Sequence, residues 1–200
     1  MSKIILMLGH QSKVGKDTLA DQLVEHAGFK KIAFADKLKE VCSDLFNIPL
    51  QEFYDEKLKN EIVEQHGMTR RRILQIVGQA MFEVDKLVWV KHALKKFENL
   101  DRIVLTDFRF IHEIGKIQEF AAENGYTVIT VKLTREGIPE FTGKEDRSEL
   151  ELINYQWEFR IQNNGTIDEL TEKGIAIVNF MDQNSESLKN CILDSKAEIV

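Results

Sequence analysis

The chain has 200 residues, of which 43% are hydrophobic and 30% are charged, with a formal net charge of −6 and a pI near 5.5. This composition is typical of a folded globular domain long enough to bury a substantial core. The acidic balance argues against nucleic acid as the main partner, because binding to a phosphate backbone normally needs a basic surface. The apolar run IILML near the start is too short to span a membrane. We therefore expect a cytoplasmic protein with no membrane partner.

The order of the predicted elements indicates an α/β fold. Apolar runs predict strands at residues 4–8, 30–34, 101–107 and 126–133, and a short one from 157 that ends at 163–165. Helical spacing of apolar residues predicts helices from residue 16 and over 36–46, 50–68, 69–84, 85–98, 111–125 and 166–181. The polar segment 134–150 is expected to be a loop or lid. Strands that alternate with helices favour a parallel sheet covered on both faces.

The stretch GHQSKVGKDT, which begins at Gly9, has the main features of a phosphate-binding loop. A glycine turn between a strand and a helix, with a lysine at the helix start, supplies backbone N–H groups and a fixed cation. Two positions depart from the usual pattern: His10 stands where the first glycine is expected, and Asp17 replaces the Ser or Thr after Lys16. Asp17 could hold a metal ion directly or through water, or polarise an acceptor, and Thr18 supplies the displaced hydroxyl. The alternative is an ordinary turn before a helix.

A second candidate site is the segment TDFRFIHE, which follows a predicted strand. Asp107 at the carboxyl end of that strand lies where α/β folds bind ligands. Arg109 could then clamp a phosphate through two hydrogen bonds. The alternative is that Asp107 caps a helix and Arg109 pairs with Glu113 on the surface.

Two clusters of cations complete the candidates. Arg70 to Arg72 oppose the dipole of the helix that they begin, which indicates an anion nearby, either a substrate phosphate or the acidic stretch at Glu61 and Glu64. Arg135 and Arg147 lie in the polar segment, which could be a lid that excludes water and neutralises a transferring phosphoryl group, or a solvated loop.

Seven motifs occur in a fixed order along nearly the whole chain: VGKDTLAD, AFADKLKE, RRILQIVG, VWVK, LTDFRFIHE, RSE and IQNNGTIDEL. In this order they resemble the deoxynucleoside monophosphate kinases of bacteriophages, a branch of the phosphate-loop (P-loop) nucleotide kinases. The GKD form is also found in animal phosphomevalonate kinases, which are similar to this branch. The resemblance implies a single P-loop NTPase domain over residues 1–200, a three-layer α/β/α sandwich with a central parallel sheet. It also implies a helical insertion at about 36–98 that binds the nucleoside monophosphate, and a short lid at about 134–152.

The resemblance implies transfer of the γ-phosphoryl group of ATP to a deoxynucleoside 5′-monophosphate, with Mg²⁺ as cofactor. The residues implied to bind ATP are Ser12, Lys13, Val14, Gly15, Lys16, Asp17, Thr18, Asn164 and Gly165. Those implied to bind the deoxynucleoside monophosphate are Ala35, Asp36, Lys37, Arg72, Gln75, Trp89, Asp107 and Arg109. The catalytic residues would be Lys16, Asp17, Arg109, Arg135 and Arg147, with Asp17 and Thr18 at the metal.

Two other functions stay open at this point. One is another small-molecule kinase, such as a phosphomevalonate kinase, and the other is a non-catalytic regulatory protein that binds nucleotides. The oligomeric state is also open, with a homodimer as one option, and a phage-encoded protein would act in the cytoplasm of the host.

Overall fold

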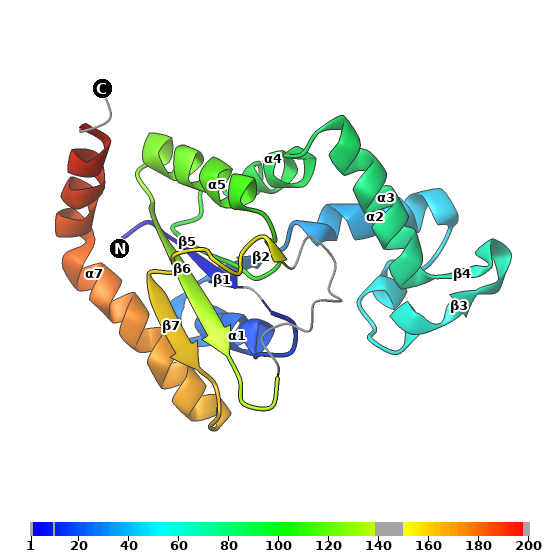
Figure 1. The fold of residues 1–200 in the computed structure, drawn as a ribbon, viewed down its shortest axis with the longest axis horizontal. Coiled ribbons are helices and arrows are strands. Elements are labelled where there is room, and N and C mark those ends of the chain that lie inside the picture. The colour runs from blue at the N-terminus through cyan, green and yellow to red at the C-terminus, as the bar shows by residue number, and fades with distance from the viewer. Residues whose placement is uncertain (1, 10, 139–149, 198–200) are drawn as a thin grey trace. The chain divides into compact units, whose positions relative to one another are not determined.

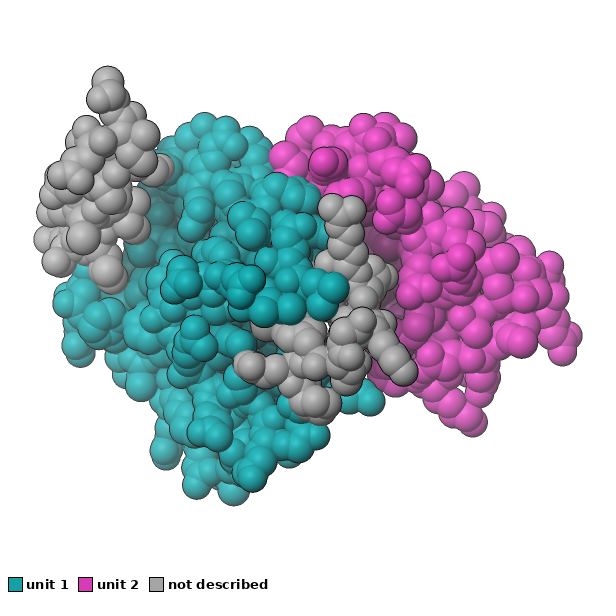
Figure 2. Space-filling model, viewed as in Figure 1, with its two compact units in different colours: residues 1–32, 97–200 teal, residues 33–96 magenta. Residues whose placement is uncertain are grey.

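The computed structural model describes residues 2–9, 11–138 and 150–197, with side chains described as far as residue 184. The chain divides into two compact units (Figure 2), residues 1–32 with 97–200 and residues 33–96. We call them unit 1 and unit 2. Among the described helices, none is both long and apolar enough to cross a membrane.

Unit 1 is built on a five-stranded sheet with the strand order β2-β5-β1-β6-β7, in which every neighbouring pair is parallel. The strands are β1 (Ile4–Gly9), β2 (Lys30–Ile32), β5 (Arg102–Leu105), β6 (Thr127–Thr134) and β7 (Phe159–Gln162). Every residue of β1 is buried, as expected for the central strand of a sheet covered on both faces. The parallel sheet confirms the predicted α/β fold.

Helices cover both faces of this sheet (Figure 1). Helices α1 (Lys16–Ala27) and α7 (Ile167–Ala197) pack together on one face, and α5 (Ile111–Asn124) packs on the other. Alternate strand residues share a face, so one set of strand side chains forms a core with the two helices. The central members of this core are Ile4, Leu6, Leu8, Leu19, Leu23, Val104, Val131, Leu170 and Val178. The three-layer α/β/α arrangement is therefore confirmed.

The parallel sheet also fixes where ligands can be expected. The carboxyl ends of β1, β5 and β6 meet at one edge of the sheet because the strands run in the same direction. Residues 11–15, 106–110 and 135–138 leave the sheet at this edge. In open α/β sheets, ligands bind in the crevice outside the carboxyl ends of the strands. The predicted loop and strand-end residues therefore share one edge of unit 1.

Unit 2 contains α2 (Ala35–Phe46), α3 (Arg70–Val84), α4 (Val88–Leu94) and a short hairpin of β3 (Ile62–Val63) and β4 (Met68–Thr69). Helix α2 packs on both α3 and α4. The small core of the unit consists of Cys42, Ile48, Phe53 and Ile73. Unit 2 spans residues 33–96, where the sequence predicts an insertion at about 36–98. Its role in nucleotide binding stays a prediction.

The predicted helix over 50–68 is wrong. The segment forms the short 3₁₀ turns η1 (Leu50–Phe53), η2 (Leu58–Asn60) and η3 (Glu64–His66), together with the hairpin. The carboxylate of Asp55 accepts hydrogen bonds from the backbone N–H groups of Lys57 and Leu58, both at 2.8 Å. Such local bonds compete with helix formation. Ile62 is 64% exposed, so the apolar residues in this segment do not form one buried helical face.

Other element boundaries differ by smaller amounts. Helix α7 runs to Ala197, well beyond the predicted end at residue 181. Helix α4 begins at Val88 and not at Asp85, because the Asp85 carboxylate accepts a hydrogen bond from the Leu87 N–H at 2.9 Å. The predicted lid falls largely on residues 139–149, which lie outside the described residues.

Candidate active site

The phosphate-binding loop joins β1 to α1 and turns through two left-handed residues. Lys13 has φ of 64° and Gly15 has φ of 99°. A φ above zero is uncommon for a residue with a side chain, so Lys13 marks a special backbone conformation of the loop. Successive turns of this kind direct backbone N–H groups into a concave, anion-binding surface. The sequence motif thus coincides with the backbone geometry that a phosphate needs.

Gly9 precedes the position where the first loop glycine is expected, and it has a role in packing. It is the last residue of β1, and a Cβ atom at this position would collide with the indole ring of Trp157. The Cζ atom of Phe108 lies 3.0 Å from the same position. Gly9 is therefore required for aromatic packing against the end of the strand. The first position of the loop falls on His10, which lies outside the described residues.

The side chain of Asn163 supports the phosphate-binding loop through a hydrogen bond. This residue follows β7 and is 7% exposed, and its amide donates a hydrogen bond to the carbonyl oxygen of Val14 at 2.9 Å. The backbone N–H of Asn163 is itself bonded to the Thr134 carbonyl at 2.8 Å. A side chain on Gly15 would collide with the Asn163 amide. One buried amide therefore both satisfies the Val14 carbonyl and excludes any residue larger than glycine at position 15.

The start of α1 presents donors to the same loop. Gly15 is the N-cap, its carbonyl accepts from the Leu19 N–H at 2.9 Å, and it has no side chain to bond the N–H groups of the first turn. The ammonium group of Lys16 donates to the carbonyl oxygen of Gln11 across the loop. Helix N-termini of this kind bind anions through free N–H groups and the helix dipole. The arrangement suits a phosphate group beside Lys16.

Asp17 lies in a charged network at the first turn of α1. Its Oδ1 atom accepts hydrogen bonds from Lys31 of β2 at 2.9 Å and from the Thr106 hydroxyl at 3.0 Å. Lys31 also pairs with Asp21 at 3.0 Å. Partial burial alone would raise the pKa of Asp17, but these hydrogen bonds and the charges of Lys31 and Lys16 outweigh it and lower the pKa below its usual value. Asp17 is therefore a carboxylate at neutral pH.

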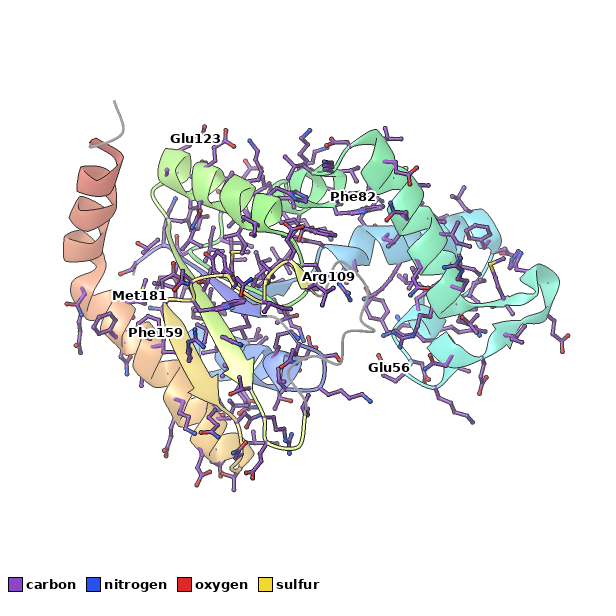
Figure 3. All side chains as sticks on the ribbon, viewed as in Figure 1. Glu56, Phe82, Arg109, Glu123, Phe159 and Met181 are labelled. Carbon is purple, nitrogen blue, oxygen red and sulfur yellow. The ribbon has the colours of Figure 1, made fainter. Side chains whose placement is uncertain are left out.

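The strand-end segment after β5 is organised by a buried carboxylate. Glu113 of α5 is 7% exposed, and its Oε2 atom accepts from the backbone N–H groups of Arg109 at 2.6 Å and Phe110 at 3.0 Å. Burial raises the pKa of Glu113 to about 7, against the effect of these two bonds, and the negative charge of Asp107 raises it further. The alternative in which Glu113 pairs with Arg109 on the surface is therefore wrong. Figure 3 labels Arg109, which is exposed in the segment between β5 and α5.

The other predicted residues of unit 1 are placed as follows. Arg135 is exposed directly after β6, and Arg147 lies outside the described residues. The Asn164 side chain accepts from the Glu136 N–H at 2.8 Å and donates to the Glu136 carboxylate at 3.2 Å. Gly165 adjoins this pair, and a Cβ atom there would collide with the Glu169 carboxylate. The adenine contacts expected of Asn164 and Gly165 stay a prediction.

In unit 2, the residues predicted to border the monophosphate already have partners. Ala35 begins α2, and the Asp36 carboxylate accepts from the Tyr54 hydroxyl at 2.9 Å and lies 3.5 Å from the Lys39 ammonium group. Lys37 pairs with Glu40 at 3.0 Å. These contacts hold the first turn of α2 against the segment that contains Tyr54.

The three arginines at the start of α3 have different environments. Arg70 is largely buried, pairs with Glu52 and donates to the Leu58 carbonyl at 3.0 Å. Arg71 reaches Glu56 at 3.5 Å. Carboxylates therefore explain two of the arginines, but they are those of Glu52 and Glu56. Of the suggested acidic stretch, Arg70 meets the backbone carbonyl of Glu61 at 3.4 Å.

The remaining predicted residues of unit 2 lie on α3 and α4. Arg72 and Gln75 are exposed and lie three residues apart on α3, which places them on one face of that helix. Trp89 is half-buried on α4. The structure thus leaves Arg72 and Gln75 accessible to a ligand, as their predicted role needs.

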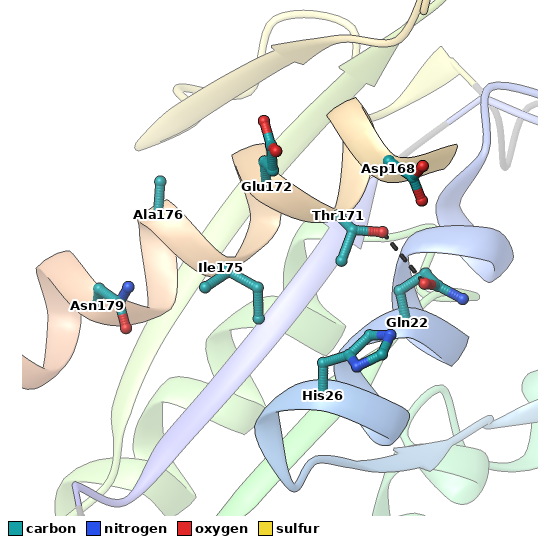
Figure 4. Close-up of a pocket in the computed structure, with 8 residues that line it drawn as sticks. All are labelled: Gln22, His26, Asp168, Thr171, Glu172, Ile175, Ala176 and Asn179. Atoms are coloured by element: carbon teal, nitrogen blue, oxygen red, sulfur yellow. Dashed lines mark hydrogen bonds between the residues drawn. The ribbon is translucent and has the colours of Figure 1, made fainter. Parts of the chain in front are cut away.

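A surface groove lies between α1 and α7, and its lining residues include none of the predicted site residues (Figure 4). It is bridged by a hydrogen bond from the Thr171 hydroxyl to the Gln22 side chain at 3.2 Å. Its lining includes the carboxyl side chains of Asp168 and Glu172, with His26 on the opposite wall. Two carboxylates make this groove a poor site for a polyphosphate, so we place no nucleotide there.

Several residues of the candidate site were not found by sequence reasoning. They are Lys31, Thr106, Lys132 and Asn163. Lys132 is 6% exposed and pairs in register with Gly9, so its backbone lies beside the last residue of β1. Of the four, Asn163 and Thr106 had a sequence signal, because Asn163 opens the NNG motif and Thr106 opens the segment TDFRFIHE, from which their neighbours were chosen. The others depend on strand register, which a single sequence does not reveal.

Comparisons with known proteins agree with the fold. The fold is similar to that of shikimate kinase from Acinetobacter baumannii, which superposes with a TM-score of 0.50 and 14% identity, covering 92% of this chain and 95% of that one. A gluconokinase from Sinorhizobium meliloti gives a TM-score of 0.49 and 14% identity, with 92% of this chain and 95% of that one covered. No family model matches the sequence.

The chain is also similar in sequence to a viral protein. A protein of Acanthamoeba polyphaga mimivirus named "Putative deoxynucleotide monophosphate kinase" is 27% identical over 186 residues. The match covers 84% of this chain and 93% of that protein.

Proposed function

We propose that this protein is an ATP-dependent kinase that transfers the γ-phosphoryl group of ATP to a deoxynucleoside 5′-monophosphate, yielding the diphosphate and ADP. The observation that carries the proposal is the loop between β1 and α1, with left-handed Lys13 and Gly15, the buried Asn163 brace and Lys16 at the helix start. The name of the mimivirus relative supports the choice of acceptor. A viral relative also fits our expectation of action in the cytoplasm of a host cell.

The mechanism would depend on positioning and charge neutralisation, because the acceptor phosphate already carries a nucleophilic oxygen. The loop N–H groups and Lys16 would bind the phosphates of ATP, and Arg109, Arg135 and Arg147 would neutralise charge on the transferring group. Asp17 and Thr18 offer hard oxygen donors of the kind that Mg²⁺ prefers, together with nucleotide phosphates. Bound Mg²⁺ would supply further neutralisation of the phosphate charge.

Each unit contains candidate residues for the acceptor. Arg72 and Gln75 of α3 are exposed and available for a phosphate and a base, and Trp89 offers an aromatic surface. Asp36 and Lys37, at the start of α2, are the further candidates of unit 2. In unit 1, Asp107 after β5 is the candidate. A homodimer is compatible with this assignment and is not required by it.

The decisive experiment measures ADP release with ATP, Mg²⁺ and a panel of acceptors. The panel contains ribonucleoside and deoxynucleoside monophosphates, and also phosphomevalonate and shikimate. We expect turnover with at least one deoxynucleoside monophosphate. Turnover on another small molecule alone would identify a different P-loop kinase, and tight ATP binding without turnover on any acceptor would identify a regulatory nucleotide-binding protein.

A paired variant tests the loop itself. Lys16→Ala should lower the turnover number by about 100-fold or more, since it removes the fixed cation beside the transferring group. The control is Lys30→Ala, which removes an exposed lysine of β2. Both variants should keep the melting temperature of the wild-type protein. Near-normal ADP release by Lys16→Ala would show that this loop is not the catalytic one.

A further inference from the structure

The segment 106–110, which connects β5 to α5, has a fixed backbone around one exposed cation. Arg109 is exposed between two more buried neighbours. On its strand side, Phe108 is 2% exposed, and the centre of its ring lies 6.0 Å from that of Trp157. The Thr106 hydroxyl, at the start of the segment, is bonded to the first turn of α1 at 3.0 Å. The chain before Arg109 is therefore held by packing and by a hydrogen bond.

Glu113 holds the backbone on the helix side. It is the third residue of α5, and its Oε2 atom accepts the N–H of the N-cap residue Phe110 at 3.0 Å. A glutamate at this position commonly reaches back to the N-cap N–H, and that bond alone completes its part of a capping box. Here the same oxygen reaches one residue further and accepts the Arg109 N–H at 2.6 Å, which is the shorter of the two bonds. Helix capping explains the bond to Phe110 but not the bond to Arg109.

The position of this carboxylate lowers the stability of the protein. Glu113 is 7% exposed, and its burial raises its pKa to about 7, helped by the negative charge of Asp107. A carboxyl group that ionises less readily in the folded state than in the unfolded state reduces stability at neutral pH and above. Groups with such perturbed ionisation are common at functional sites, where activity is kept at some expense of stability. The two residues whose charges act on Glu113, Asp107 and Arg109, are both predicted site residues.

We propose that Glu113 is a positioning residue for Arg109. Its oxygen fixes the backbone at Arg109 and Phe110, so that the exposed guanidinium group is presented from a rigid point at the carboxyl edge of the sheet. A cation that is ordered before the reaction stabilises a transferring phosphoryl group more effectively than one that must be ordered during it. Glu113 itself does not contact the nucleotides. This inference rests on the proposed function, in which Arg109 neutralises charge on the transferring group.

The first test measures the turnover number and the Michaelis constants of variants at position 113. The assay contains ATP, Mg²⁺ and the deoxynucleoside monophosphate that the panel shows to be turned over fastest. Glu113→Met fills a similar volume without an acceptor oxygen and should lower the turnover number about 10-fold or more, with little change in the Michaelis constant for ATP. Glu113→Gln keeps an acceptor oxygen and should retain most of the activity. A wild-type turnover number for Glu113→Met would overturn the inference.

The matched control is Glu119→Gln, which changes an exposed carboxylate on the same helix and should leave both constants at their wild-type values. Melting temperatures show which variants are folded under the assay conditions. If Glu113→Met does not fold, Glu113→Asp takes its place, because its shorter side chain draws the carboxylate back from the Arg109 N–H. The same loss of turnover is then expected, and wild-type turnover by Glu113→Asp would overturn the inference.

A double-mutant cycle shows whether Glu113 acts through Arg109. Arg109→Ala should lower the turnover number about 100-fold or more, because it removes a cation from the transferring group. Adding Glu113→Met to Arg109→Ala should then have little further effect, since residues that act as a unit give non-additive losses. If the two losses multiply instead, Glu113 acts independently of Arg109 and the inference is wrong. Absence of turnover by the wild-type protein on every acceptor would instead refute the proposed function.

Discussion

The carboxylate of Glu113 links the stability of the protein to pH near neutrality. Its Oε2 atom accepts the backbone N–H groups of Arg109 and Phe110, and its burial raises the pKa from 4.5 to about 7. In the unfolded chain the same group titrates near its ordinary value. Between these two values the folded state binds more protons than the unfolded state, so the free energy of unfolding falls as pH rises. Glu113→Gln removes this titration and keeps an oxygen that can accept a hydrogen bond.

The size of the effect follows from the difference in pKa. One pKa unit corresponds to about 1.4 kcal/mol, so a difference of about 2.5 units gives about 3 kcal/mol. The wild-type protein should therefore lose about 3 kcal/mol relative to Glu113→Gln between pH 4 and pH 8. The loss is complete above the folded pKa of about 7. Other titrating groups are common to both proteins and cancel in the comparison.

Urea denaturation at a series of pH values measures this difference directly. The control is Glu119→Gln, on the same helix, where the carboxylate is exposed and pairs with Lys116. We expect the control curve to run parallel to the wild-type curve and the Glu113→Gln curve to converge with it at low pH. Parallel curves for the wild type and Glu113→Gln would refute the reasoning, because Glu113 would then titrate alike in the folded and unfolded states.

Three further predictions concern packing around the loop and within unit 2. Asn163→Ala leaves the Val14 carbonyl without its donor, so it should lower the free energy of unfolding by about 1–3 kcal/mol and weaken ATP binding. Denaturation and calorimetry measure the two effects. Wild-type values for both would show that the Asn163 hydrogen bond does not support the loop. Gly9→Ala drives a methyl group into Trp157 and should cost about 1–3 kcal/mol, measured as a lower melting temperature. Arg70→Met leaves the Glu52 carboxylate unpaired and should destabilise the protein in urea, whereas an unchanged midpoint would show that the pair is dispensable.

The arrangement of strands and helices in unit 1 could be predicted from the sequence because its signals are local. The strands β1, β5 and β6 contain clear apolar runs, and the glycine turn with Lys16 marks the boundary between β1 and α1. The helix predicted over residues 50–68 is wrong for a reason that is also local. Its apolar residues have helical spacing, but side-chain bonds such as those of Asp55 stabilise turns instead.

The candidate site was only partly predictable, because the residues that surround Asp17 come from distant segments of the chain. Thr106 and Lys31 reach Asp17 through the adjacency of β5, β2 and α1, which no pattern in the sequence specifies. Glu113 could be identified as part of a motif, but its burial, and hence its raised pKa, follows from how α5 packs.

The two consecutive asparagines after β7 limit how the edge of the sheet can move. Asn163 is bonded to the phosphate-binding loop at Val14, and Asn164 is bonded to Glu136 in the segment that follows β6. Consecutive Cα atoms are about 3.8 Å apart, so these two segments are tethered through a single peptide unit. Movement of one of these segments away from the other therefore strains the hydrogen bonds at Asn163 or Asn164. The state of the loop and the position of Glu136 are therefore mechanically coupled, whichever of them a ligand touches first.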